Sequence, residues 1–154
     1  MTIRKKKSPS GQSVTSPLDT EILIIGGGMV GATLATAFGQ SGVDVCVVDT
    51  QDPLDGLDAG FDGRASAIAL ASQRVLVALN IWPALHPGAA PIKDIRVSEG
   101  SSPFFLHYDH RAAGDDPLGY MVENRDTIAA LHQLVAESAI DWRAPANAVR
   151  VTRG

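Results

Sequence analysis

Three glycines and one aspartate are the residues of this chain whose types and spacing indicate chemistry. Gly26, Gly28 and Gly31 follow the spacing G-x-G-x-x-G, which is typical of a turn that binds the pyrophosphate of a dinucleotide. In such a turn the first glycine permits a sharp bend, the second lets the pyrophosphate approach the backbone, and the third lets the following helix pack against its strand. Asp49 lies eighteen residues after Gly31, close to the spacing of a carboxylate that accepts hydrogen bonds from an adenosine ribose.

The segments around these residues predict a strand, a helix and a second strand. Residues 22–25 are apolar and mostly β-branched, and they run directly into the glycines. Residues 32–40 are compatible with a helix that carries Leu34 and Phe38 on one face. Residues 43–48 are apolar except for Asp44 and predict a second strand. We therefore expect a βαβ unit of Rossmann type, and the alternative is a glycine-rich loop in an unrelated fold.

The start of the predicted helix is the expected anion site. The backbone N–H groups of Met29, Val30 and Gly31 have no partner within a helix that begins there. These groups and the helix dipole favour a bound anion such as a pyrophosphate. Asp49 would then lie at the end of the second strand and bind the ribose of the same ligand.

Composition and charge narrow the function classes. The chain has 154 residues, 45% of them hydrophobic and 19% charged, which is ordinary for a globular protein. The formal net charge of −4 argues against nucleic acid as the main partner. The single cysteine, Cys46, is expected to be a small buried residue, and it suits a reducing, cytoplasmic compartment.

The first twenty residues differ from the rest. Residues 1–20 are rich in Ser, Thr, Lys and Pro, so we expect a disordered basic tail, followed by one domain over residues 21–154. The basic cluster at residues 4–7 is either a solvated leader or a contact with an anionic membrane surface. A secretory signal is the less favoured alternative, since the following apolar run is broken by glycines and preceded by Asp19 and Glu21.

The remainder of the chain predicts alternating loops, helices and strands. Residues 51–62 form an acidic loop rich in turn residues, and residues 82–91 form a second connection. Helices are predicted from residue 64 to about 80 and from about 124 to 138, and strands at 95–97, 104–108, 119–122, 140–142 and 148–151.

Arg64 and a pair of histidines are further candidates for binding. Arg64 falls at the start of a predicted helix, where a cation is unfavourable, which indicates a role toward another anion such as a cofactor phosphate. The alternative is an ordinary surface arginine. His107 and His110 lack a third ligand at suitable spacing, so we expect no metal site there. No arrangement of residues indicates a catalytic acid, base or nucleophile.

Several stretches together resemble the FAD-dependent aromatic-ring hydroxylases of ubiquinone biosynthesis, the UbiH-like family within the class A flavoprotein monooxygenases. The glycine turn with Asp49 fits many FAD and NAD enzymes. The two specific stretches are residues 62–70, which read DGRASAIAL, and residues 119–125, which read GYMVENR. The matching stretches cover most of residues 21–134. The resemblance implies an α/β, three-layer FAD-binding domain of Rossmann type, of which residues 21–154 would be the incomplete N-terminal part.

The resemblance also implies a cofactor site and a reaction. FAD would bind with its pyrophosphate at the glycine turn and its ribose on Asp49, and Arg64 would contact it as well. Asn124 or Arg125 would approach the FAD, and the resemblance does not fix which, because Thr127 stands where the family pattern has leucine. The implied reaction uses NADH or NADPH and O₂ to hydroxylate a polyprenylated phenol. The hydrophobic substrate implies contact with the periphery of the inner membrane or with partner proteins of ubiquinone biosynthesis.

Two later motifs of the family are missing from the sequence, as are its substrate-domain sheet and C-terminal helices. We therefore expect the N-terminal portion of a hydroxylase, with little or no activity by itself. The alternatives are another class A flavoprotein, a small NAD-binding oxidoreductase, or a non-catalytic FAD-binding module.

Overall fold

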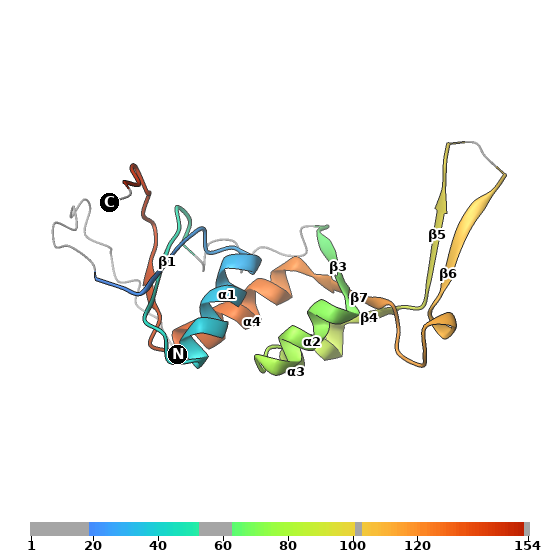
Figure 1. The fold of residues 1–154 in the computed structure, drawn as a ribbon, viewed down its shortest axis with the longest axis horizontal. Helices are drawn as coiled ribbons and strands as arrows, with labels where there is room; N and C mark the ends of the chain where they lie inside the picture. The colour runs from blue at the N-terminus through green and yellow to red at the C-terminus, as the bar shows by residue number, and fades with distance from the viewer. Residues whose placement is uncertain (1–18, 53–62, 101–102, 153–154) are drawn as a thin grey trace, which may run out of the picture.

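A parallel sheet and its crossover helix form one end of the molecule. The computed structural model describes residues 19–52, 63–100 and 103–152. Strands β1 (Ile22–Ile25), β2 (Val45–Val48) and β8 (Asp141–Arg143) pair in parallel in the order β1-β2-β8. Helix α1 (Met29–Gln40) connects β1 to β2 (Figure 1). The predicted βαβ unit is confirmed.

The alternation of side chains along the strands determines which face of this sheet α1 covers. Ile24, Val45 and Val47 point to one face and are buried together with Ala35 of α1. Successive residues of a strand point to opposite faces. Leu23 accordingly faces the other way and is 52% exposed. The described residues thus cover one face of the sheet with helices and leave apolar side chains on the opposite face.

Cys46 lies in the middle of β2 and is fully buried. Burial raises the pKa of its thiol, with a further contribution from the charge of Asp141. A buried thiol with a raised pKa is unreactive. The expectation of a small buried residue is confirmed.

A second, antiparallel sheet lies beside the helices. Its strands β3 (Ala65–Ala69), β7 (Gly119–Glu123) and β4 (Ala90–Ile92) pair in the order β3-β7-β4. Helix α2 (Leu70–Ala78) follows β3 directly, and helix α4 (Asn124–Ala136) follows β7 and packs along α1 (Figure 1).

The main core lies between these elements. Short helix α3 (Trp82–Leu85) and the 3₁₀ turn η1 (His86–Gly88) close it from the side of α2. Its buried residues come from α1, α2, α3, β7 and α4, together with Leu79 and Ile81 between α2 and α3; they are Ala32, Leu76, Leu79, Ile81, Trp82, Leu85, Val122 and Leu131. The core therefore ties the βαβ unit to the second sheet.

A two-stranded ribbon projects from the second sheet. Strands β5 (Asp94–Ser98) and β6 (Phe105–Asp109) pair only with each other among the described residues, and the 3₁₀ turn η2 (His110–Ala112) follows β6. The ribbon extends away from the helices (Figure 1).

The predictions for the second half of the chain are largely confirmed. Strands β5 and β7 and helix α4 occur where they were predicted, and β6 and β8 are each displaced by one residue. The connection at residues 82–91 also contains helix α3 and the start of β4, which were not predicted. The predicted strand at 148–151 is wrong, because those residues pair with no strand in the described part of the chain.

The predicted helix from residue 64 to 80 is wrong in its first part. Residues Ala65–Ala69 form β3, and the helix begins only at Leu70. Each residue of β3 pairs with one of β7, from Ala65 opposite Glu123 to Ala69 opposite Gly119. Small residues in this stretch are compatible with either structure, and the distant partner strand decides in favour of the strand. Arg64 therefore precedes a strand, and the inference from its place in a helix dipole no longer holds.

Two expectations concern residues outside the described ranges. The predicted disordered tail falls almost wholly on residues 1–18, and most of the predicted acidic loop falls on residues 53–62. Within the described ranges, no helix combines the length and the apolar character needed to cross a membrane.

Leu131 provides a test of the core. Its side chain projects from α4 into the main core and is fully buried there. Leu131→Ala should lower the free energy of unfolding by about 2–5 kcal/mol, because it removes buried methyl groups and leaves a cavity. Urea denaturation followed by circular dichroism measures this. The control Val149→Ala truncates a side chain that is 91% exposed and should change stability by less than about 0.5 kcal/mol. Equal effects of the two changes would contradict this description of the core.

Candidate functional site

The glycine turn joins β1 to α1. Gly26 has a φ of 101°, which side chains other than hydrogen rarely allow, and its N–H donates to the carbonyl of Val48 at 2.9 Å. Gly28 is the N-cap of α1, and no side chain caps the helix there. No acidic residue lies in the first turn of the helix. The first N–H groups of α1 are thus not claimed by a carboxylate of this helix.

Gly31 and Gly28 have opposite surroundings. A Cβ atom on Gly31 would overlap the carbonyl oxygen of Gly26 and lie 3.4 Å from Cγ2 of Ile24. A Cβ atom on Gly28 would meet nothing within 4 Å. The third glycine therefore allows close packing of helix and turn, while the second leaves open space above the backbone. This agrees with the roles that the sequence predicts for them.

Asp49 lies at the end of β2 with its carboxylate against the turn. The N–H of Gly27 donates to Oδ2 of Asp49, and the N–H of Gln51 donates to Oδ1 at 2.8 Å. The N–H of Asp49 itself donates to the carbonyl of Arg143 in β8 at 3.0 Å. The hydrogen bond from Gln51 is the main reason that the pKa of Asp49 lies below its usual value, and those from Gly27 and Thr50 add to it. The carboxylate is therefore ionised at neutral pH.

Two cavities border this carboxylate. One, of about 110 Å³, is lined by the glycine turn, the residues after β2, α4 and β8; these are Gly27, Gly28, Asp49, Gln51, Asp52, Ile128, His132 and Trp142. The other, of about 180 Å³, lies between the ends of β1 and β2 and residues 146–148. Asp49 thus lies between two hollows beside the uncapped start of α1.

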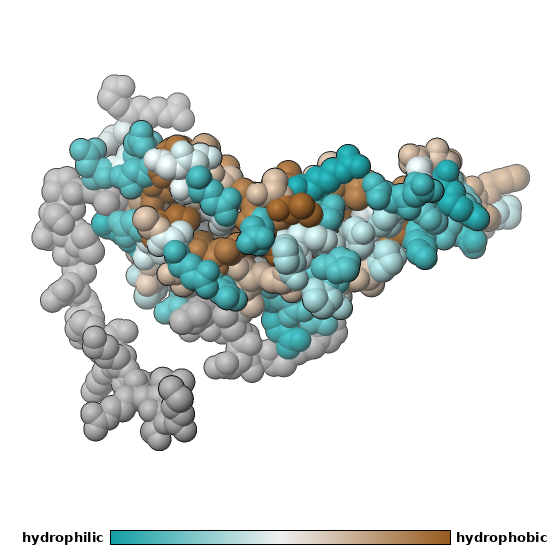
Figure 2. Space-filling view, turned by 90° about the horizontal axis from the view of Figure 1, so that it is seen from below, coloured by the Kyte–Doolittle hydropathy of each residue, from teal (hydrophilic) through white to brown (hydrophobic). Residues whose placement is uncertain are grey.

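A larger apolar cavity of about 440 Å³ borders the first turn of α1. Met29 and Val30 line it from α1, Ser66 and Ile68 from β3, and Thr127 from α4, with residues of α2 completing it. Val30 is 83% exposed. Figure 2 shows apolar side chains reaching the surface over the central part of the molecule.

The three remaining predicted site residues gather at the junction of β3, β7 and α4. The N–H of Asn124 donates to the carbonyl of Arg64 at 3.1 Å, and the hydroxyl of Ser66 donates to Oδ1 of Asn124 at 2.6 Å. Arg125 forms ion pairs with Glu123 at 3.1 Å and with Asp126 at 3.4 Å. The structure therefore brings Arg64 and Asn124 together. None of Arg64, Asn124 and Arg125 lines the three cavities described above.

Sequence reasoning missed two aromatic residues of the site. The indole of Trp142 lies over Gly27, so that a Cβ on Gly27 would overlap it. The ring of His132 meets this indole edge to face with centroids 4.9 Å apart. Trp142 pairs with Val47 in the register of β8 on β2, which places it next to the end of the strand that carries Asp49. The pairing register of β8 on β2 could have identified Trp142 as a site residue. Using it requires knowing that β8 is the neighbour of β2.

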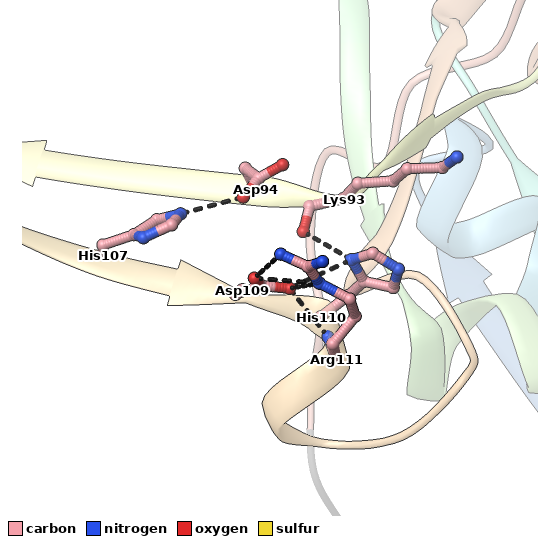
Figure 3. A network of polar contacts seen from close by, with 6 residues as sticks. All are labelled: Lys93, Asp94, His107, Asp109, His110 and Arg111. Atoms are coloured by element: carbon pink, nitrogen blue, oxygen red, sulfur yellow. Dashed lines mark hydrogen bonds and ion pairs between the residues drawn. The ribbon is translucent and has the colours of Figure 1, made fainter.

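The histidines of the ribbon serve separate local contacts. At its base, Nε2 of His107 lies 2.8 Å from the carboxylate of Asp94, while His110 lies against the carbonyl of Lys93 at 3.0 Å (Figure 3). Arg111 pairs with Asp109, and its hydrogen bonds lower the pKa of that carboxyl. Within the described ranges, no group of three or more His, Cys, Asp or Glu side chains could hold a metal ion.

Comparison with known families places the chain in one of them. Residues 19–141 match the model of the FAD binding domain. The chain belongs to this family. The glycine turn, the open space above Gly28 and the ionised Asp49 all fit the diphosphate and ribose of FAD.

Curated relatives agree with the resemblance drawn from the motifs. The ubiquinone hydroxylase UbiL of Rhodospirillum rubrum is 54% identical over 105 residues, which are 68% of this chain and 24% of the relative. The 3-demethoxyubiquinol 3-hydroxylase of Escherichia coli is 34% identical over 137 residues, which are 87% of this chain and 35% of the relative. The chain thus spans between a quarter and about a third of the length of these relatives.

Solved structures share the fold. PqsL, a probable FAD-dependent monooxygenase from Pseudomonas aeruginosa, has a TM-score of 0.60 at 20% identity, covering 80% of this chain and 32% of that chain. The p-nitrophenol 4-monooxygenase PnpA from Pseudomonas putida has a TM-score of 0.59 at 19% identity, covering 79% of this chain and 30% of that chain. The predicted α/β fold of an FAD-binding domain is confirmed.

Substitution of the two contrasting glycines tests the geometry of the turn. Gly31→Ala should destabilise the fold by about 1–3 kcal/mol, because the new methyl group overlaps the backbone of Gly26. Gly28→Ala should change stability by less than about 1 kcal/mol, because its φ of −64° suits alanine and the space is open. Urea denaturation of both variants measures this. A Gly28→Ala variant that is the less stable of the two would contradict the described turn.

The hydrogen bonds of Asp49 predict a stability that depends on pH. Because folding lowers the pKa of Asp49 below its ordinary value of 3.8, its ionised form stabilises the folded state. This contribution is complete above the unfolded pKa and is lost as the pH falls through the folded pKa. Asp49→Asn should therefore be less stable than the wild type at neutral pH, and the difference should shrink as the solution is acidified.

Free energies of unfolding measured from neutral to acidic pH test this. Asp116→Asn is the control, because it removes a carboxylate whose side chain is 68% exposed and lies 3.5 Å from Arg74. This control should show a smaller difference at neutral pH. If the difference in free energy of unfolding between the wild type and Asp49→Asn stays constant on acidification, the assigned hydrogen bonds are contradicted.

Proposed function

We propose that this chain supplies the ADP-binding part of the FAD site in an FAD-dependent, NAD(P)H-using monooxygenase. Its substrate would be the aromatic ring of a polyprenylated phenol in ubiquinone biosynthesis, with O₂ as co-substrate. The observation that carries the proposal is the ionised carboxylate of Asp49, which lies at the backbone of an uncapped glycine turn. The names of the curated relatives support the reaction class.

The residues of the chain have separate roles in this proposal. The N–H groups at Met29, Val30 and Gly31 bind the diphosphate, and the open space at Gly28 lets it approach. Asp49 accepts hydrogen bonds from the ribose hydroxyls. FAD, when bound, supplies the redox chemistry, while these residues orient it.

Arg64, Asn124 and Arg125 are proposed as further contacts of the cofactor. Arg64 and Asn124 lie side by side at the start of β3, where a hydrogen bond holds their backbones together. Ser66 fixes the Asn124 amide from the same strand and also lines the apolar cavity beside Met29 and Val30. Ser66 therefore links this junction to the cavity at the start of α1.

The protein that carries this chain is proposed to be cytoplasmic. Because its substrate class is hydrophobic, we expect this protein to contact the periphery of a membrane. The apolar side chains of the ribbon agree with a surface that is covered in the assembled protein. Phe104 is 82% exposed, and Val97, Phe105 and Leu106 are more than half exposed.

Titration of the chain with FAD tests the proposal. Isothermal titration calorimetry should show binding, and Asp49→Asn should weaken it by about ten- to a hundredfold, because a charge-assisted hydrogen bond to the ribose is lost. Gly28→Ala should also weaken binding, because its methyl group occupies the path of the diphosphate. The control Asp116→Asn should bind like the wild type.

Two outcomes would contradict the proposal. One is that the wild type binds NAD and not FAD, which favours a small NAD-binding oxidoreductase. The other is that Asp49→Asn, folded by circular dichroism, binds FAD as tightly as the wild type.

A further inference from the structure

His132 is an ionisable residue of the site to which no motif assigns a role. It comes from α4 and lines the same cavity of about 110 Å³ as Asp49, Gly27 and Gly28. Its ring contacts Trp142, and Trp142 in turn covers Gly27. The imidazole is therefore held on the wall of the cavity that opens on the start of α1.

The groups that face His132 come from three elements. Asp49 at the end of β2 and Asp52 after it act on the imidazole by their negative charge, and both raise its pKa. Burial lowers the pKa and outweighs them, so that the pKa lies below the ordinary value of 6.5. The other side chains that line the same cavity, those of Gln51, Ile128 and Trp142, carry no charge. In the free protein His132 is therefore mainly neutral at neutral pH.

We propose that His132 is the proton acceptor of this cofactor site and that binding of a dinucleotide diphosphate at the glycine turn protonates it. The inference rests on the function proposed above, since it requires the diphosphate to bind at Gly28 and the helix start. The proton comes from the solvent, and the imidazolium then balances the charge brought in by the ligand. His132 acts by charge and position, and it takes no part in the oxidation.

Electrostatics gives the direction of the effect. A diphosphate adds negative charge beside a cavity that already holds the ionised Asp49. An added negative charge favours the protonated imidazole, and one within about 4–6 Å shifts a pKa by roughly 1–3 units. The pKa of His132 is therefore higher in the complex than in the free protein. By linkage, the ligand binds more tightly at a pH below the pKa of the complex, and its affinity falls as the pH rises.

Proton uptake on binding tests this directly. FAD is the probe, because its diphosphate is a diester and does not titrate near neutral pH. Calorimetric titrations at a fixed pH in buffers of different ionisation enthalpy give the number of protons taken up per FAD bound. This number should lie between zero and one. Titrations repeated at several pH values should find it largest near pH of about 6–7. The dissociation constant should rise about tenfold or more between pH of about 5.5 and 8.

His132→Gln should still bind FAD and should lose both the proton uptake and the pH dependence. The control His107→Gln alters an exposed histidine of the ribbon and should behave like the wild type. Proton uptake that is absent in the wild type, or retained in His132→Gln, would overturn the inference while leaving the proposed function intact. Failure of the wild type to bind FAD at any pH would instead overturn the proposed function, and the inference with it.

A second measurement covers the case in which His132→Gln does not fold. The ring protons of His132 in the wild type report its pKa by nuclear magnetic resonance, without and with FAD. A pKa that rises by one unit or more on binding supports the inference, since one unit is a tenfold change in equilibrium. A pKa that stays the same or falls overturns it.

Discussion

The hydrogen bond between the carboxylate of Asp49 and the backbone of Gly27 is the contact on which the site depends. It fixes the end of β2 against the turn that follows β1, and it leaves the start of α1 open. A second carboxylate oxygen is held by the N–H of Gln51, so that the acid is both positioned and kept ionised before any ligand arrives. The close contact of Gly31 with Gly26 sets the approach of α1 to the same turn. In the proposed function, these contacts preorganise the site for the diphosphate and the ribose of FAD.

Around this contact the fold adds groups from distant parts of the chain. β8 pairs with β2 and brings Trp142 over Gly27, while α4 packs along α1 and brings His132 to the same cavity. β3 and β7 bring Arg64 and Asn124 together, and Ser66 of β3 bonds Asn124 and lines the cavity beside Met29. The two cavities differ in chemistry, because the cavity beside Asp49 holds charged and aromatic groups, whereas the cavity beside Met29 is lined mainly by apolar side chains together with hydroxyl groups of Ser and Thr. This division suits a ligand with a polar nucleotide end.

The parts of the site that sequence could predict are those made by neighbouring residues. The glycine turn, the start of α1 and Asp49 lie within thirty residues of each other, and their spacing is enough to indicate the βαβ unit and its ligand. β3 was mistaken for a helix because the residues ASAIA suit both structures, and only pairing with β7, fifty or more positions away, decides between them. His132 and Trp142 were missed for the same kind of reason, since Trp142 reaches Asp49 through the register of β8 on β2, and His132 through the packing of α4 along α1. Long-range pairing was thus the information that local pattern could not supply.

The central claim is that the glycine turn and Asp49 bind the diphosphate and ribose of FAD, and backbone amide resonances test it most directly. A ¹⁵N–¹H spectrum of the chain titrated with FAD should show its largest shifts at the amides of residues 27–31 and at Gln51, whose N–H is bonded to the Asp49 carboxylate. Amides of the ribbon formed by β5 and β6 should stay unchanged. Shifts concentrated on the ribbon, or an unchanged glycine turn in the presence of bound FAD, would contradict the account.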